Sequence, residues 1–470
     1  MSARNRELLA LIPVALLAAA GFAAVLITRA DEINNLSLIY GAYFLGICVA
    51  GHLFLRWRLP YADPYLFPLC ALLAALGLVV IYSLDEGFAL NQASVFALGM
   101  AVLIATVIFL RDYHVLERYR YLIAAAAMLL LLAPRIPGIG QQVNGAYLGV
   151  GLGPVNFQPT ELAKIGIVVF LASYLAENRE LLSVAARRFM GLTIPPLKHF
   201  GPLLVVWGAA MVLLVFIRDL GSSLMFFGAF LVLLYIATQR FSYVLIGVLM
   251  FGVGVGFFAE TVGHVQDRFD IWLDPFARGA PDGAYQIQQS LFAQADGGLF
   301  GQGLGEALIK FPGPFFPAET CAQFNLQFPE CGSILPAPHT DFIFAVIVNE
   351  LGVFGGCAVI LTYGLIAARG FKIAVMAPDG FSKLLAAGLS AVFALQAFVI
   401  IGGVVKAIPL TGVTLPFVSF GGSSVIANMI LLALLLLISD RARRPQTPGT
   451  GGVIVDEPSG VFPTLSEGRA

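Results

Sequence analysis

Apolar stretches of about 20 residues recur along almost the whole 470-residue chain, and each is long enough to cross a hydrocarbon core of about 30 Å as a helix. Twelve spans are predicted, at residues 8–28, 37–55, 65–83, 93–110, 119–134, 159–177, 201–217, 222–238, 243–261, 339–368, 383–403 and 421–439. Hydrophobic residues make up 59% of the chain and charged residues only 12%, against about 25% in ordinary soluble proteins. Because a water-soluble fold of this composition could not cover its own surface, we expect an all-α polytopic membrane protein.

Lysine and arginine fall in alternate connections between the predicted spans, and the positive-inside rule places those connections in the cytoplasm. The cytoplasmic set comprises Arg56, Arg58, Arg111, Arg118, Arg120, Arg179, Arg187, Arg188, Lys198, Arg369, Lys372, Arg441, Arg443 and Arg444. The opposite set contains the long stretch 262–338, which has eight acidic residues against three basic ones. We therefore expect this loop to face outward and, with an even number of spans, both termini to be cytoplasmic.

The two ends of the chain carry different signals. Arg4 and Arg6 precede an apolar run as in a signal peptide, but no convincing small-residue cleavage site follows, so a retained first helix is expected. From Arg441 onward the sequence becomes rich in Pro, Gly and Thr with little apolar content. Such a composition predicts a disordered cytoplasmic tail.

The five cysteines divide by location. Cys48, Cys70 and Cys357 lie inside apolar spans, where a cysteine normally behaves as a small hydrophobic residue. Cys321 and Cys331 both lie in the outward loop, in an oxidising compartment, and we predict a disulfide between them. A tie across so short a loop would contribute about 2–3 kcal/mol to local order. The alternative is two free thiols in a flexible loop.

The glycine-rich stretch Gly297-Gly-Leu-Phe-Gly-Gln-Gly-Leu-Gly305 also lies in the outward loop. It lacks the spacing and the strand–helix setting of a dinucleotide-binding motif. We interpret it as loop.

The strongest candidate for chemistry is Pro336-Ala-Pro-His-Thr-Asp-Phe-Ile-Phe344, where the outward loop meets an apolar span. Polar and ionisable side chains at such a depth are costly and usually functional, which makes His339, Thr340 and Asp341 candidates. The alternative is structural, because Thr340 or Asp341 could cap the following helix.

Other charged residues border the same outer surface. Glu161 and Lys164, three residues apart after Pro159, share one helix face, and Arg218, Asp219 and Lys406 lie at other outward ends. All five are candidate substrate contacts. The alternatives are an ion pair in the first helical turn for Glu161 and Lys164, and a structural turn for Arg218 and Asp219.

Two further segments have mixed character. Trp272-Leu-Asp-Pro275 and Tyr285-Gln-Ile-Gln-Gln-Ser290 suit either a surface that binds a sugar or lipid headgroup, or an amphipathic helix lying on the membrane. Ser419-Phe-Gly-Gly-Ser-Ser424 supplies small residues that favour close helix packing, with Ser419 also a candidate substrate contact.

These residues carry a resemblance to a known family. The motifs, in order, are Asn144-Gly-Ala146, Phe157-Gln-Pro-Thr-Glu-Leu-Ala-Lys164, Arg218-Asp-Leu-Gly221, Trp272-Leu-Asp-Pro275, Tyr285-Gln-Ile-Gln-Gln-Ser290, His339-Thr-Asp-Phe342, Glu350-Leu-Gly352, and Pro409-Leu-Thr-Gly-Val-Thr-Leu-Pro416 with Ser419-Phe-Gly-Gly-Ser-Ser424. Over about residues 65–440 the chain resembles the RodA/FtsW (SEDS) family of peptidoglycan glycosyltransferases. The two preceding spans resemble the extended form of actinobacterial RodA-type proteins.

The resemblance implies a ten-helix core and a reaction. It divides the chain into two extra transmembrane helices (1–60), a glycosyltransferase core (61–440) that includes the extracytoplasmic loop 262–338, and the tail 441–470. The implied activity is polymerisation of lipid II, an undecaprenyl diphosphate disaccharide-pentapeptide, on the outer face of the membrane, with Asp341 as the catalytic residue. Two departures stand out: Leu148-Gly149 replaces an Arg-Trp pair, and the loop before His339 is longer than usual.

The resemblance also implies partners. A class B penicillin-binding protein is expected to pack its single helix near 339–368 and 383–403, where glycines permit close approach; these are Gly352, Gly355, Gly356, Gly364, Gly388, Gly402 and Gly403. Lipid II and membrane lipids are the other expected partners, and no nucleic acid is expected. The departing diphosphate needs cations, for which Lys164, Arg218 and Lys406 are candidates; a divalent cation is possible but no motif indicates one.

Two competing functions remain at this point. A twelve-helix protein could instead be a transporter that flips a lipid-linked precursor, although the sequence shows no two matched halves with interrupted helices. A scaffold that only recruits a partner would neither polymerise nor translocate.

Overall fold

A computed structural model of the chain describes residues 2–28, 37–143, 146–152, 155–184, 187–189, 192–194, 208, 219–277, 283–307 and 335–445. Ten helices in these ranges are long and apolar enough to span a membrane. They are α1 (Ala3–Thr28), α2 (Ser37–Arg58), α3 (Leu66–Leu84), α4 (Glu86–Phe109), α7 (Pro159–Val184), α9 (Leu220–Thr238), α10 (Phe241–Thr261), α14 (Ile343–Met376), α15 (Gly380–Val404) and α16 (Gly422–Arg443). The polytopic helical architecture is confirmed.

The predicted number of twelve spans is not confirmed. The span predicted at 119–134 corresponds to α6 (Arg120–Leu132), whose 13 residues reach only about 20 Å. Pro134 lacks an amide hydrogen and stands in a short 3₁₀ turn, η1 (Ala133–Arg135), so the α-helix ends before it. The span predicted at 201–217 lies outside the described residues.

The remaining short elements include strands that the all-helical prediction did not contain. β1 (Gly140–Val143), β2 (Ala146–Leu152) and β3 (Val155–Phe157) form an antiparallel sheet in that order, and β4 (Arg187–Phe189) pairs with β5 (Leu192–Ile194). Each strand of the first sheet contains a valine, a β-branched residue that favours extended backbone. β3 ends at Phe157, just before α7 begins, and Phe157 lines the cavity described below.

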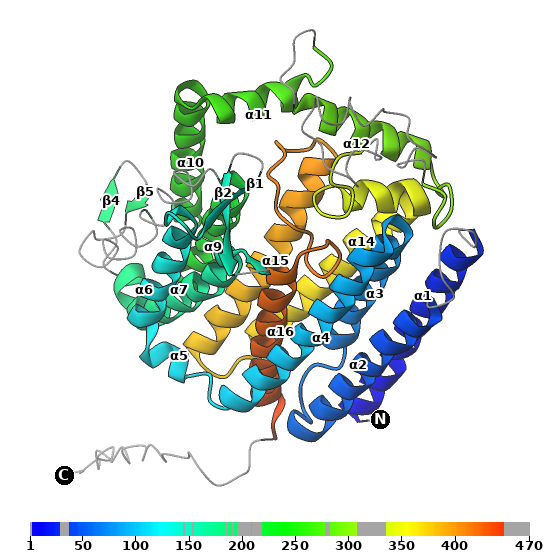
Figure 1. The fold of residues 1–470 in the computed structure, drawn as a ribbon. Helices are drawn as coiled ribbons and strands as arrows, with labels where there is room; N and C mark the ends of the chain where they lie inside the picture. The colour runs from blue at the N-terminus through cyan, green and yellow to red at the C-terminus, as the bar shows by residue number, and fades with distance from the viewer. Residues whose placement is uncertain are drawn as a thin grey trace, which may run out of the picture.

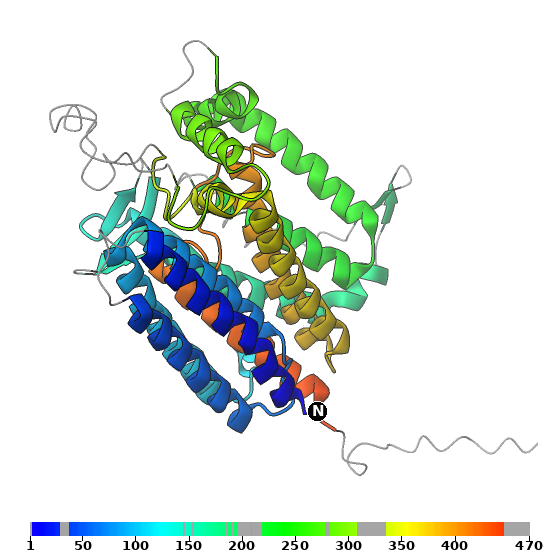
Figure 2. The ribbon, with the colours of Figure 1, turned by 90° about the vertical axis from the view of Figure 1, so that its right-hand side faces the viewer.

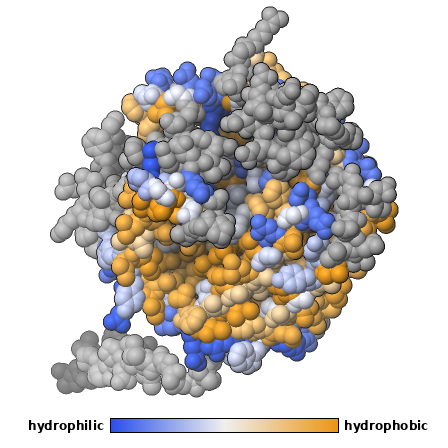
Figure 3. Space-filling model, viewed as in Figure 1, coloured by the Kyte–Doolittle hydropathy of each residue, from blue (hydrophilic) through white to orange (hydrophobic). Residues whose placement is uncertain are grey.

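The helices α11 (Gly263–Leu273) and α12 (Ala284–Gly297) lie across one end of the bundle, and the N-terminus and the last turn of α16 lie at the opposite end (Figures 1 and 2). The short helix α5 (Val115–Arg118) lies toward this second end as well. Hydrophobic residues cover much of the middle of the visible face, with hydrophilic ones toward its ends (Figure 3). This distribution suits a protein that crosses a membrane between the two ends.

The first two helices are firmly attached to the rest of the bundle. α1 packs against α3, and α2 packs against α1 and α4. At the end of the bundle that carries the N-terminus, Glu7 accepts a hydrogen bond from Arg4 (2.5 Å) and pairs with Nδ1 of His52 (2.7 Å), and all three residues are buried. Arg4 also donates to the carbonyl of Ala62 (2.5 Å), so this charged cluster joins the helix pair to the start of α3.

Helix α14 is broken near its N-terminal end. Gly352 has φ 70° and ψ −175°, which is incompatible with a helix, so the element consists of a half-helix, 343–351, and a longer helix, 353–376. The 24 residues of the longer part reach about 36 Å and can span the membrane alone. The half-helix 343–351 is therefore not needed to span the membrane.

Most glycines expected to face a partner helix are instead buried in contacts within the chain. A Cβ at Gly388 would lie 2.7 Å from Val168, and one at Gly403 would lie 3.2 Å from Leu410. Gly352 is buried at the helix break. Gly364, in contrast, has nothing within 4 Å of a built Cβ and is exposed on α14. Among these four glycines, Gly364 is therefore the one whose position leaves room for another helix to approach closely.

Candidate active site

A cavity of about 630 Å³ is lined in part by residues of α11 and α12. Its walls come from segments far apart in the sequence: β2, the residues just before α7, Asp219 before α9, α11, the start of α12, the turn before α14, the end of α15 with the loop after it, and the start of α16. Of the predicted site residues, Asp219, His339, Thr340, Asp341 and Lys406 line it.

Asp341 lies in the wall of this cavity, in the turn that precedes the half-helix. The N-cap position of α14 is Phe342 and no side chain caps it, so the capping role considered for Thr340 or Asp341 is not the one adopted. Burial raises the pKa of the Asp341 carboxyl to about 6, against the opposing effect of the positive charge of Arg268. A carboxylate with such a pKa can accept a proton near neutral pH.

Arg268 is a residue of this site that the sequence did not single out. It lies in α11, lines the cavity, and donates a hydrogen bond from Nη1 to the carbonyl of Leu410 (2.6 Å). Its charge acts on both cavity carboxyls, Asp219 and Asp341, while burial lowers its own pKa. In the sequence Arg268 counted only as one of three basic residues in an acidic loop, and its position six residues before the Asp274-Pro275 motif was the available signal.

His339 is held by aromatic neighbours. Its ring stacks on Phe88 with centroids 4.3 Å apart and meets the edge of Phe420 at 5.6 Å. The carbonyl of His339 accepts a hydrogen bond from the amide of Phe420 (2.8 Å). Burial lowers the pKa of the imidazole, so the ring favours its neutral form.

Thr340 and Ser419 join the turn before α14 to the segment before α16. The Ser419 hydroxyl donates to the carbonyl of Thr340 (2.7 Å) and accepts from the amide of Leu415 (2.9 Å). Ser419 is buried and is not part of the cavity wall. This geometry favours the packing interpretation of Ser419 over a contact with substrate.

Glu161 and Lys164 form a buried pair beside the cavity rather than in its wall. The two residues are 4% and 2% exposed, and Lys164 Nζ lies 2.5 Å from Glu161 Oε2. Lys164 also bonds Gln396 (2.6 Å), whose amide donates to the carbonyl of Thr414 (2.9 Å) in the cavity wall. The geometry favours the ion-pair interpretation, with the pair supporting the cavity from behind.

The other predicted residues have mixed positions. Asp219 caps α9, accepting from the amide (3.0 Å) and hydroxyl (2.6 Å) of Ser222, while it also lines the cavity. Lys406 lines the cavity and its Nζ lies 3.3 Å from the carbonyl of Leu273. Arg218, Cys321 and Cys331 lie outside the described residues.

Two hydroxyls complete the polar lining. Thr411 and Thr414 line the cavity, and their Oγ1 atoms have no hydrogen-bond partner within the described ranges. Within the same ranges no group of three or more His, Cys, Asp or Glu side chains is arranged to hold a metal ion. The wall therefore offers the carboxyls of Asp219 and Asp341, the imidazole of His339, two cations and two hydroxyls without a hydrogen-bond partner in the described ranges.

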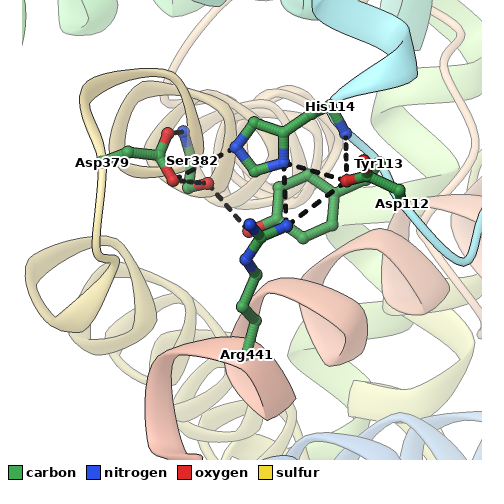
Figure 4. Close-up of polar contacts among 6 residues, drawn as sticks. All are labelled: Asp112, Tyr113, His114, Asp379, Ser382 and Arg441. Carbon is green, nitrogen blue, oxygen red and sulfur yellow. Dashed lines mark hydrogen bonds and ion pairs between the residues drawn. The ribbon is translucent and has the colours of Figure 1, made fainter. Parts of the chain in front are cut away.

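A second polar cluster lies at the other end of α16, about 33 Å away along the 22 residues of that helix. The imidazole of His114 lies between Asp112 (3.2 Å) and Asp379 (3.3 Å), and Arg441 bonds Asp112 (3.3 Å) (Figure 4). Asp379 caps α15 through Ser382. These bonds tie three helix ends together, and the cluster contributes nothing to the cavity.

The comparison with a protein-family model decides the relationship. The model of the FtsW, RodA and SpoVE proteins, described as "Cell cycle protein", matches residues 64–321 and 330–444. The chain belongs to this family. The match begins after α2 and is interrupted only at 322–329, within the loop that the sequence marks as longer than usual in the family.

Curated relatives and solved structures agree with this membership. The peptidoglycan glycosyltransferase RodA of Mycobacterium tuberculosis (strain ATCC 25618 / H37Rv) is 39% identical over 457 residues, covering 94% of this chain and 92% of the relative. The probable peptidoglycan glycosyltransferase FtsW of Geobacter sp. (strain M18) is 30% identical, covering 81% and 97%.

Among solved structures, a chain from work on the coordination of polymerization and crosslinking by a peptidoglycan synthase complex has a TM-score of 0.63 and 26% identity, covering 81% of this chain and 98% of that one. Thermus thermophilus RodA has a TM-score of 0.56 and 25% identity, covering 82% and 98%.

Proposed function

We propose that the chain polymerises lipid II into glycan strands on the outer face of the membrane, with the Asp341 carboxylate as general base. The enzyme class rests on family membership and on the curated relatives: the chain is a peptidoglycan glycosyltransferase and a multi-pass protein of the bacterial membrane. The observation that carries the base assignment is the position of Asp341 in the cavity wall, with a pKa raised to about 6.

The reaction requires only one carboxylate. A hydroxyl oxygen of one sugar bonds to the anomeric carbon of another as the bond from that carbon to the lipid diphosphate breaks. Asp341 takes the hydroxyl proton, and the diphosphate departs with the electron pair and needs no proton of its own. The single displacement inverts the anomeric centre, and no second carboxyl is needed, unlike in glycosidases.

The diphosphate is assigned to the cationic part of the cavity. Arg268 and Lys406 line this part of the cavity, and a guanidinium can bind phosphate oxygens in a bidentate manner. The hydroxyls of Thr411 and Thr414 can add hydrogen bonds to the substrate. Since the described residues offer no metal-binding group of three ligands, a divalent cation used in this reaction would take its ligands chiefly from the diphosphate and water.

The orientation of the chain follows from charge placement. With the basic connections in the cytoplasm, the cavity lined in part by α11 and α12 opens on the outer side, where a lipid-linked sugar would be polymerised. The N-terminus and the last turn of α16 lie at the opposite end, so both termini are assigned to the cytoplasm (Figure 1).

A crosslinking partner is proposed on α14. The similar chain in the peptidoglycan synthase complex works with a crosslinking activity, and we assign the corresponding partner here to a class B penicillin-binding protein. Exposed apolar residues of α14, including Phe354, Leu361 and Leu365, form a stripe with Gly364. A single partner helix can approach closely there.

Gly364→Phe should therefore weaken copurification of the partner by about tenfold, equivalent to about 1.4 kcal/mol. The control is Gly252→Phe on α10, an exposed position that also has nothing within 4 Å of a built Cβ. Pull-down of the tagged chain, with the partner quantified, measures both. Equal retention by the two variants would remove this stripe of α14 from consideration.

An experiment with purified protein in liposomes distinguishes a polymerising enzyme from a flippase and from a scaffold. Lipid II is placed in one leaflet, and polymer is read by electrophoresis and translocation by accessibility of a labelled headgroup. Glycan polymer is the expected product. Translocation without polymer would instead indicate a flippase, and neither signal would indicate a scaffold.

A further inference from the structure

The glycine-rich segment 297–305 lies directly against the break in α14. Four backbone hydrogen bonds join them: Gln302 N to Asn349 O (2.9 Å), Gly303 N to Glu350 O (3.0 Å), Val353 N to Gly298 O (2.9 Å) and Phe354 N to Leu299 O (3.3 Å). The loop thus uses the backbone groups that the break in the helix leaves without helical partners. We call segment 297–305 with residues 349–354 the clasp.

The clasp requires glycine on both sides. A Cβ at Gly301 would lie 2.1 Å from the carbonyl oxygen of Glu350, and a Cβ at Gly352 would lie 2.2 Å from that of Leu299. One at Gly297 would lie 2.0 Å from the carbonyl oxygen of Val348. Gly301 and Gly352 also have positive φ angles of 84° and 70°, which other residues adopt only with strain. The two backbones therefore approach as closely as the absence of side chains allows.

A buried carboxylate fastens the clasp to a third element. Glu350 is 1% exposed, and its Oε1 accepts hydrogen bonds from the hydroxyl of Ser83 (2.8 Å) and the amide of Gly305 (3.2 Å). Ser83 is in α3, so the outer loop, the half-helix and the core bundle meet at this one oxygen. The side-chain amide of Asn349 donates a further hydrogen bond to the carbonyl of Ala293 in α12 (2.8 Å).

The half-helix 343–351 joins the clasp to Asp341. Its residues from Ile343 to Glu350 are buried, and close packing of this kind restricts bending within the half-helix. Asp341 lies in the turn at its other end. We propose that the clasp positions Asp341: Glu350 and the glycines 297, 301 and 352 fix one end of the half-helix and thereby place the carboxylate at the other. Glu350 is then a positioning residue. This inference rests on the proposed role of Asp341 as the base.

Gly301→Ala tests the clasp against a matched control, Gly138→Ala. Both glycines have positive φ, but Gly138 lies outside the clasp and the cavity lining and a Cβ there meets nothing within 4 Å, so the control adds the same backbone strain without wedging the clasp open. Because a displacement of about 1 Å at a reacting group can cost up to about 100-fold in rate, we expect Gly301→Ala to lower kcat for lipid II polymerisation by about 10–100-fold, with KM changed by less than about threefold. Gly138→Ala should keep kcat within about threefold of the parental value. Parental kcat in Gly301→Ala would overturn the inference.

A double-mutant cycle shows whether the effect passes through Asp341. In an Asp341→Glu background the carboxylate is already displaced, so Gly301→Ala should cost less than about threefold there. The same loss in both backgrounds would mean that the clasp does not position Asp341. An Asp341→Asn variant at the parental rate would instead refute the base assignment itself, whatever the clasp variants do.

Glu350 supplies a second test where Gly301→Ala does not fold. Glu350→Gln keeps an acceptor oxygen for Ser83 and Gly305, whereas Glu350→Ala removes it. We expect kcat to fall by about tenfold or more in Glu350→Ala and to stay within about threefold in Glu350→Gln, each measured on protein that elutes as a single species. Parental kcat in Glu350→Ala would overturn the positioning role.

Discussion

Asp341→Asn should lower the rate of glycan polymerisation by about 10²–10⁴-fold, because an amide of the same shape cannot take the proton of the attacking hydroxyl. The folded protein should be retained, since the N-cap of α14 is Phe342 and no side-chain cap is lost. The measurement is polymer formed from lipid II by purified protein, with thermal unfolding in detergent recorded in parallel.

The matched control is Asp270→Asn, the same change at an exposed carboxylate of α11. It should polymerise at the parental rate. If Asp341→Asn does so too, another group accepts the proton and the general-base assignment is wrong.

Arg268→Gln is expected to have the second largest effect, a loss of about 10²–10³-fold in kcat/KM, because it removes a cation positioned where negative charge develops on the departing diphosphate. The substitution should also raise the pKa of Asp341 further, since the charge of Arg268 opposes the effect of burial on that carboxyl. The acidic limb of the pH–rate profile should therefore move to higher pH in this variant.

Arg240→Gln provides the comparison, because Arg240 is an exposed arginine at the start of α10, away from the cavity lining. Parental kcat/KM is expected for it. An Arg268→Gln enzyme with parental kcat/KM and an unmoved acidic limb would show that Arg268 neither binds the diphosphate nor acts on Asp341.

Ten of the twelve predicted membrane spans correspond to long apolar helices of the described residues, because hydrophobicity over about 20 residues is a local property. The break in α14 could not be predicted, since apolar residues continue on both sides of Asn349, Glu350 and Gly352 and the run 339–368 was predicted as one span. Its cause is tertiary: the backbone of 297–305 bonds the broken turn. The glycine-rich stretch was correctly read as loop, but its contact lies in another span.

The residues of the candidate site could likewise be predicted only where the signal lies within one short segment of the sequence. His339, Thr340 and Asp341 were predicted because they interrupt an apolar boundary within one short segment. Arg268 was missed because only the fold brings α11 over the turn that carries Asp341. Glu161 and Lys164 are adjacent on one helix face whether they bind substrate or each other, so only the structure reveals that Lys164 pairs with Glu161 and with Gln396.

The most direct test of Asp341 as the general base is the pH dependence of kcat/KM for lipid II polymerisation. The free enzyme's base sets the acidic limb of this profile. Because the pKa of Asp341 is raised to about 6, the carboxylate is ionised above that pH, and the rate should rise through about pH 6 to a plateau and be lost as the pH falls. A profile that stays flat across this range, or an acidic limb that persists unchanged in Asp341→Asn, would contradict the assignment.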